Sequence, residues 1–195
     1  MKSTQSLGDI IPPLTIDNVI FGYRPGELSV LLVRQKSGAS LRKWKLPGDW
    51  LTEHESLEQC AARSLVRRTG IANATLHQFR TFSEVDRYPD QRVITTAFYT
   101  FVIRGLHQLM LSEDELAIDW FDIKSVPELS FDHAKILKIG VEHLRELARR
   151  QPMGFGVLPP KFTLLELQEL YEAIFDQKFD KPNFRRRILK FEHLG

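Results

Sequence analysis

Three side chains that could do chemistry fall on one predicted helix face. Ser64, Arg67 and Arg68 are spaced i, i+3 and i+4, so they lie on the same side of a helix. A hydroxyl and two permanent cations make a poor site for a divalent metal ion, which prefers anionic oxygen ligands. At about 4–6 Å, repulsion between a guanidinium and such an ion costs several kcal/mol even at an effective dielectric constant of about 20. The spacing therefore predicts that this face binds no catalytic metal.

The two arginines admit three interpretations. Arg67 and Arg68 are solvated helix surface, or they contact an anionic ligand, or they form salt bridges elsewhere. Arginine suits a phosphate because its planar guanidinium donates paired hydrogen bonds. We favour the solvated surface, which is the common situation for charged helix residues, and keep the other two open.

The helix that positions these residues has recognisable ends. Ser56 followed by Gln59 has capping-box spacing, and Gly70 suits the C-terminal end because glycine adopts a left-handed conformation readily. Cys60 is the single cysteine, so it cannot form an internal disulfide and is predicted to be a small core residue. The apolar stripe that should pack inward contains Leu57, Cys60, Ala61 and Leu65.

Other apolar runs predict an α+β domain over residues 1–151. Pro25 and Gly26 separate the first two runs, which indicates a hairpin. The run 92–104 is apolar enough for a central strand, and Asp132 is a suitable N-cap for an amphipathic helix over 132–151. The predicted strands are 16–23, 28–35, 76–83, 92–104 and 117–123, and residues 43–50 are predicted to be a short strand that runs into a loop.

A small C-terminal module follows a change in composition. Residues 152–160 concentrate proline and glycine and are predicted to be a linker. Within residues 161–195, Thr163 and Glu166 form a second capping box, and Asp180 can start a final helix near Lys181. The apolar stripe of the first module helix contains Leu164, Leu167, Leu170, Tyr171 and Ile174.

The final helix is basic on one side. From Lys181 to Lys190 there are five basic residues and no acidic one. Phe184, Ile188 and Phe191 share a face and should pack inward, which leaves a basic face with an amide. Such a helix can dock in a DNA major groove, with arginine reading guanine, asparagine reading adenine and lysine contacting phosphate. The DNA-binding candidates are Lys181, Asn183, Arg185, Arg186, Arg187 and Lys190.

Residues 46–71, LPGDWLTEHESLEQCAARSLVRRTGI, resemble the Nudix box. Asp49 falls on its first glycine, Glu55 on its spaced glutamate and Arg63 on its arginine. The resemblance implies that Arg63 and Glu55 form a structural pair within an α/β/α sandwich built on a mixed sheet. The three metal-binding glutamates of the box fall on Ser64, Arg67 and Arg68, as Leu65, Gly70 and Ile71 keep the register. This departure implies that diphosphate hydrolysis is lost, with no catalytic residue and no metal.

Residues 85–101 resemble a loop and strand of Nudix-like regulators. Arg87, Pro89 and Arg92 match that pattern, whereas Tyr88 stands where an acid is expected. In relatives the loop lies near the ligand pocket or the dimer contact; a solvated loop is the alternative. The ligand-binding candidates are Arg63, Arg67, Arg68, Arg87 and Arg92.

Residues 152–194 resemble the winged-helix segment of Nudix-related bacterial transcriptional regulators, and residues 131–137 resemble their interdomain helix start. These regulators respond to ADP-ribose-type metabolites or to sugars such as arabinose. Because the sequence stops at Gly195, we expect the module to lack the β-hairpin wing and to bind DNA less tightly.

The resulting expectation is a homodimeric, ligand-responsive regulator that binds a double-stranded DNA operator and a sugar or ADP-ribose-like effector, without a cofactor. The alternatives are a Nudix hydrolase that uses other carboxylates and a scaffold with neither activity. The net charge of +2 is too small to indicate any kind of partner. The sequence has neither an apolar run of membrane-spanning length nor a signal peptide, so we expect a cytoplasmic protein. The carboxylates of the hydrolase alternative are Glu53, Glu55, Glu58 and Glu84.

Overall fold

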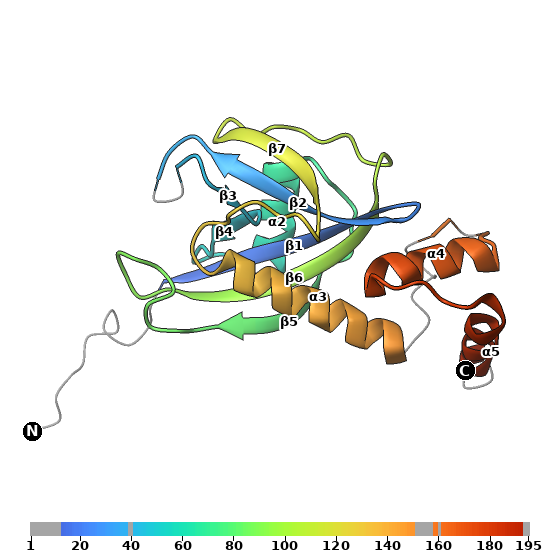
Figure 1. Ribbon diagram of the computed structural model, residues 1–195. Helices are drawn as coiled ribbons and strands as arrows, with labels where there is room; N and C mark the ends of the chain where they lie inside the picture. Colours follow the sequence, from blue (N-terminus) through green and yellow to red (C-terminus); the bar gives the residue numbers. More distant parts are fainter. Residues whose placement is uncertain (1–12, 39–40, 151–157, 160, 193–195) are drawn as a thin grey trace, which may run out of the picture.

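A seven-stranded mixed sheet with helices on both faces forms the body of the protein (Figure 1). The computed structural model describes residues 13–38, 41–150, 158–159 and 161–192. The strands are β1 (Leu14–Arg24), β2 (Glu27–Gln35), β3 (Trp44–Lys45), β4 (Gly48–Trp50), β5 (His77–Phe82), β6 (Ile94–Ile103) and β7 (Glu115–Asp122).

The long strand β1 organises the sheet. One edge pairs in parallel with β6, and the other pairs antiparallel with β4 near its start and with β2 near its end. β6 lies between β1 and β5, which confirms the predicted central strand, and β7 pairs with β2. Residues 43–50, predicted to be a short strand running into a loop, form the short strand β3 and then a second short strand, β4, because Pro47 between them has no N–H for a ladder bond.

Alternate residues of β1 face two different helices. Ile16 and Ile20 belong to the apolar clusters beneath α2 (Leu57–Thr69), whereas Val19 and Phe21 belong to the cluster that includes α3 (His133–Arg150). This division follows from the two-residue period of side chains along a strand. The two helices therefore cover opposite faces of the sheet, and the predicted sandwich is confirmed (Figure 1).

The predicted ends of α2 are confirmed. Ser56 and Gln59 form both hydrogen bonds of the capping box, and Gly70 ends the helix at φ 76° in the left-handed region. Cys60 is fully buried, as expected for a core residue. The helix thus has a fixed phase, which sets where Ser64, Arg67 and Arg68 point.

Two helices, α4 (Leu164–Phe175) and α5 (Lys181–Glu192), form the C-terminal module. The predicted capping box at Thr163 and Glu166 is present. The predicted stripe is buried except for Leu164, which is 40% exposed because it occupies the first turn, beyond the packed face. Tyr171 and Ile174 share a core cluster with sheet residues, and the Arg145 guanidinium donates to the Ile174 carbonyl at 2.9 Å. The module is therefore packed against α3 and the sheet.

The domain boundaries proposed from sequence fall at the edge of what the structure describes. α3 ends at Arg150, and most of the predicted linker 152–160 lies outside the described residues. The boundaries at 151 and 161 therefore stay a prediction. Across the described residues, none of the helices combines the length and the apolar character needed to cross a bilayer.

Candidate functional site

A cavity of about 300 Å³ opens where β1, β3 and β4 meet the loop before β6 and the start of α3. It has both charged and aromatic lining, which is typical of sites for nucleotides and other polar metabolites. Its charged lining residues are Asp17, Lys45, Asp49, Arg68 and Arg87, and its aromatic ones are Trp50, Tyr88, Phe131 and His133.

Three aromatic rings form one wall of this cavity. Tyr88 lies between the other two, with ring centroids 6.1 Å from Trp50 and 4.7 Å from Phe131. Phe131 has φ 53°, a left-handed conformation that an aromatic residue adopts at a cost of about 1–2 kcal/mol. Such strain clusters at ligand sites. The face of an aromatic ring in such a wall can stack on a purine or another planar ring.

Arg87 and Arg92, the two candidates from the loop, lie in different surroundings. Arg87 is buried, lines the cavity and donates to the Asp132 carboxylate at 2.7 and 3.0 Å. Arg92 is exposed and lies outside the cavity lining. Asp132 precedes α3 as predicted, and its carbonyl accepts from the Ile136 N–H at 3.0 Å. Arg87 therefore joins the cavity to the N-terminus of α3.

His133 lines the cavity as a buried, neutral imidazole. The Leu46 N–H donates to its Nδ1 at 3.0 Å, so the proton of the neutral ring is on Nε2, which lies 3.7 Å from Asp17. Burial lowers the pKa of His133, although Asp17 opposes this shift. The sequence alone did not identify His133, since its role depends on contacts with residues distant in the chain.

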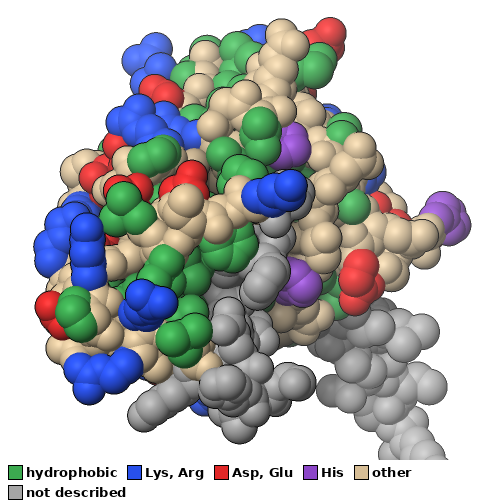
Figure 2. Space-filling view, turned by 90° about the vertical axis from the view of Figure 1, so that its right-hand side faces the viewer, with side chains coloured by type: hydrophobic (Ala, Val, Ile, Leu, Met, Phe, Trp, Pro, Cys, Tyr) green, Lys and Arg blue, Asp and Glu red, His purple; other side chains and the backbone are tan. Residues whose placement is uncertain are grey.

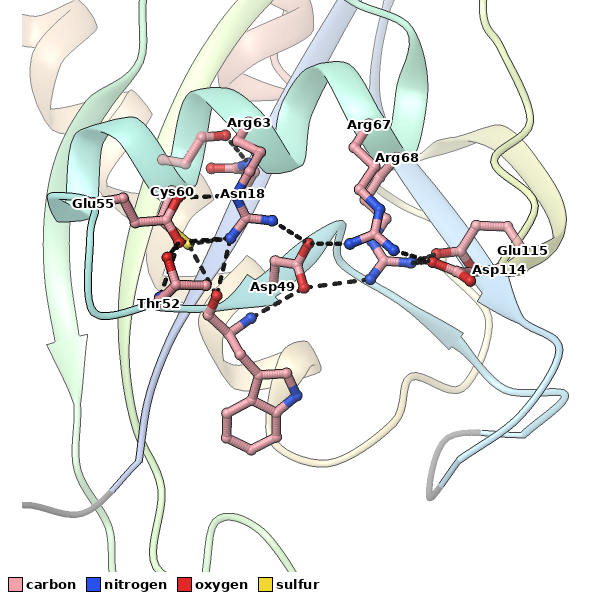
Figure 3. A network of polar contacts seen from close by, with 12 residues as sticks. Asn18, Asp49, Thr52, Glu55, Cys60, Arg63, Arg67, Arg68, Asp114 and Glu115 are labelled. Carbon is pink, nitrogen blue, oxygen red and sulfur yellow. Dashed lines mark hydrogen bonds and ion pairs between the residues drawn. The ribbon is translucent and has the colours of Figure 1, made fainter.

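Beside the cavity, Arg63 holds the loop before α2 against the helix (Figure 3). Its guanidinium donates to Glu55 at 2.7 and 2.8 Å and to Asp49 at 2.8 Å. The hydrogen bonds from Arg63 are the largest cause that lowers the pKa of Glu55, to about 2. The predicted structural pair is therefore confirmed.

Arg67 and Arg68 are tied to carboxylates rather than left in solvent (Figure 3). The Arg68 side chain is only 7% exposed and donates to Glu115 at 2.9 Å, while Arg67 donates to Asp114 at 2.6 Å. Asp49 contacts both arginines at 3.3–3.4 Å. The favoured interpretation of a solvated surface is thus wrong for Arg68, because Asp114 and Glu115, far along the chain, return to this helix. Both residues form salt bridges, Arg67 while half-exposed to solvent, and their role as ligand-binding candidates stays a prediction.

The charges of the arginines on α2 are compensated by nearby acids. The three arginines Arg63, Arg67 and Arg68 face four carboxylates, which come from Asp49, Glu55, Asp114 and Glu115. This cluster therefore has no net positive charge.

The Mg²⁺ or Mn²⁺ implied by a Nudix box does not fit these residues. Ser64 is fully buried with an unpaired hydroxyl, and the carboxylates that could serve as ligands bind guanidinium groups instead. Within the part of the chain that the structure describes, no three His, Cys, Asp or Glu residues group in a way that could hold a metal ion.

The carboxylates of the hydrolase alternative do not converge. Glu55 binds Arg63, Glu58 accepts from the Ser56 hydroxyl at 2.7 Å, and Glu84 pairs with Lys135. None of these, nor Glu53, lines the cavity.

The C-terminal helix α5 has the two faces expected of a recognition helix. Phe184 and Ile188 are buried at 4% and 6% exposure, and the Asp180 carboxylate accepts from the Asn183 N–H at 3.1 Å at the start of the helix. The Lys190 and Phe191 side chains lie outside the described part of the chain. The exposed residues of the other face are Lys181, Asn183, Arg185, Arg186 and Arg187.

Lys and Arg side chains gather on the left of the face in Figure 2, with hydrophobic and some acidic side chains between them. On α5, Arg186 donates to the side-chain Oδ1 of Asn183 at 2.6 Å, so the two side chains are held together on the exposed face.

A mixed sheet between helices, joined to a small helical module with a basic exposed face, defines a two-part binding protein. Residues 14–138 match the NUDIX domain, and residues 154–195 match the NrtR DNA-binding winged helix domain. The chain belongs to the Nudix family and carries a C-terminal winged-helix DNA-binding segment.

Three relatives are informative. The ADPR responsive transcriptional repressor NtrR of Acinetobacter baylyi is 29% identical over 183 residues, 92% of this chain and 73% of that protein. The ADP-ribose pyrophosphatase of Methanocaldococcus jannaschii is 28% identical over 127 residues, 65% of this chain and 72% of that protein. The crystal structure of Shewanella oneidensis NrtR has a TM-score of 0.78 at 28% identity, covering 91% of this chain and 85% of that chain.

Two further crystal structures of the Shewanella oneidensis protein contain ligands. One is a complex with a 27mer DNA, with a TM-score of 0.78 and coverage of 91% of this chain and 82% of that chain at 28% identity. The other is its NUDIX domain with ADP ribose, with a TM-score of 0.65 at 25% identity, covering 73% of this chain and 95% of that chain.

Proposed function

We propose that this protein is a DNA-binding transcriptional repressor whose Nudix domain binds an ADP-ribose-type nucleotide as effector. The exposed basic face of α5, opposite buried Phe184 and Ile188, is the observation that carries the DNA-binding part. The aromatic and cationic cavity supports a nucleotide ligand. The similarity to repressors in complex with DNA and with ADP ribose favours the same two ligands here.

In this proposal the protein acts in the cytoplasm as a symmetric homodimer on a palindromic operator. Two α5 helices about 34 Å apart would enter successive major grooves. Effector binding releases DNA only if the ligand prefers the dimer geometry that does not fit the operator. The packing of α4 against α3 and the sheet gives a direct route from one domain to the other.

Fluorescence anisotropy with the DNA upstream of the protein's own gene tests the proposal. Wild-type protein should bind in a salt-dependent manner, because phosphate contacts release counterions. Arg187→Gln should weaken binding, whereas Lys138→Gln on the exposed side of α3 should not. ADP-ribose should then lower the anisotropy of the wild-type complex. Binding that is insensitive to salt and to Arg187→Gln would contradict the DNA-binding role.

The second candidate function is hydrolysis of ADP-ribose, which the similarity to the Methanocaldococcus jannaschii pyrophosphatase favours. We propose that hydrolysis is absent, because arginines occupy the metal-binding face of α2 and Glu53, Glu55, Glu58 and Glu84 lie outside the cavity. Incubation with ADP-ribose and Mg²⁺ or Mn²⁺ tests this. Release of AMP that is lost in Glu55→Gln would favour the hydrolase instead.

A further inference from the structure

Lys45 differs from the other cations of the cavity. The terminal nitrogens of Arg68 contact Glu115, Asp114 and Asp49, and Arg87 contacts Asp132. The ammonium of Lys45, by contrast, has no hydrogen-bond partner among the residues that the structure describes, although it lines the cavity.

The backbone around Lys45 fixes where its side chain starts. Lys45 pairs with Val33 in the sheet, and the next residue, Leu46, donates its N–H to His133. The chain therefore cannot shift locally without breaking both contacts. The side-chain torsions of Lys45 can still change, so its ammonium can reorient toward a bound ligand.

The ammonium of Lys45 has charged neighbours but no hydrogen-bond acceptor among the described residues. Burial lowers the pKa of Lys45, and the nearby carboxylates of Asp17, Glu115 and Asp49 raise it again without hydrogen bonds to the ammonium. An ammonium removed from water needs acceptors to compensate for its lost hydration. Phosphate oxygens are strong acceptors for such a group.

The other cations of the cavity are already compensated. Arg68 pairs with Asp49, Asp114 and Glu115, and Arg87 pairs with Asp132. Among the described residues, Lys45 is therefore the lining cation without a hydrogen-bonded carboxylate. Since the residues of α2 do not fit a metal ion, a protein cation has to meet the charge of a bound phosphate.

We propose that Lys45 binds the phosphate groups of the ligand directly, in place of metal ions, and so selects a phosphorylated ligand over a neutral sugar. This inference rests on the proposed function only in taking the ligand to be a nucleotide. The aromatic wall of Trp50, Tyr88 and Phe131 would hold the base, while Lys45 reads the diphosphate.

Isothermal titration of the full chain with ADP-ribose in EDTA tests the inference. A lost charge-assisted hydrogen bond corresponds to about 10- to 100-fold in Kd, so Lys45→Met should weaken binding by about that factor. Lys43→Met is the matched control, because Lys43 lies two positions away and pairs with Glu128 outside the cavity. Lys45→Arg should recover part of the affinity, which a variant that merely perturbs the fold would not do.

The outcomes separate this inference from the proposed function. Equal affinity of wild type and Lys45→Met, or wild-type binding that EDTA abolishes, overturns the role of Lys45 alone. If the wild type does not bind ADP-ribose, the proposed effector is wrong, and inorganic pyrophosphate becomes the probe. A rise in melting temperature with pyrophosphate that requires Lys45 then supports the inference; no rise overturns it.

Discussion

Removing Arg68 should destabilise the protein far more than removing its neighbour Arg67. Arg68 pairs with Glu115, whose side chain is fully buried, so Arg68→Met leaves a carboxylate in the core without its cation. Breaking one side of a buried ion pair costs about 3–5 kcal/mol. For a chain of about this length, each kcal/mol lowers the melting temperature by about 2–4 °C. We therefore expect a decrease of about 6–20 °C in a circular dichroism melt at neutral pH.

The effect should depend on pH in a defined direction. Burial raises the pKa of Glu115 above its ordinary value of 4.5, and Arg68 is the largest influence that lowers it. An acid whose pKa is higher in the folded state than in the unfolded state stabilises the protein at pH values below its unfolded pKa. That stabilisation is lost as the pH rises through the folded pKa. Without Arg68, the folded pKa rises further. The deficit of Arg68→Met should thus be smallest near pH 4.5 and grow toward neutral pH.

Two variants serve as controls. Arg67→Met removes a half-exposed arginine whose partner Asp114 is also exposed, and such pairs contribute only about 0–1 kcal/mol. Replacing Glu115 by Leu together with Arg68→Met removes both charges and should recover most of the stability. The reasoning is refuted if Arg68→Met melts like Arg67→Met, or if its deficit does not change between pH 4.5 and 7.

Three further outcomes follow from other contacts. Gly22→Ala should lower the melting temperature, because its Cβ would lie 2.3 Å from the Trp120 ring and overpacking costs about 1–3 kcal/mol; an unchanged melt would contradict this. Phe131→Gly should bind ADP-ribose about 5- to 100-fold more weakly in a titration, because a stacking ring is lost. Its free energy of unfolding in urea should stay within about 1 kcal/mol of the wild type, because glycine relieves the backbone strain at this position. Hydrogen bonds from Arg63 lower the pKa of Glu55 to about 2, so ionised Glu55 stabilises the fold above pH 4.5, and this stabilisation is lost as the pH falls toward 2. In urea unfolding, the stability of Glu55→Gln should therefore decrease less between pH 4.5 and 2 than that of the wild type. An equal decrease in both proteins would argue against the pair.

Local signals account for most of the elements that were predicted from sequence. Capping boxes at Ser56 and Thr163, the glycine at 70 and the apolar stripe of α2 are all encoded within a few residues of one another, and all are confirmed. The split of residues 43–50 into two short strands came from Pro47, whose effect on a ladder depends on its partner strand. Short-range chemistry was therefore a good guide to helices and a weaker one to short strands.

The site was harder to predict because distant segments build it. The sequence pattern drew attention to Arg67 and Arg68, but the acids that neutralise them, Asp114 and Glu115, lie more than forty positions away. Lys45 belongs to none of the motifs found in the sequence. A lysine in a short strand gives no sign of a binding role until the fold places it in a cavity. Tyr88, noted only as a departure from a pattern, belongs to the aromatic wall. Long-range pairing, rather than residue type, decides which of these side chains meets a ligand.

Asp49 shapes the mutational routes open to this protein. It stands where a Nudix box has glycine, and its carboxylate contacts Arg63, Arg67 and Arg68 together. Replacing Arg68 by glutamate would place two acids side by side and leave Glu115 without its cation, so this substitution should destabilise the fold. Compensating changes at Glu115 or Asp49 would have to accompany it. The residue type at position 68 is therefore constrained by folding itself, independently of any contact with a ligand.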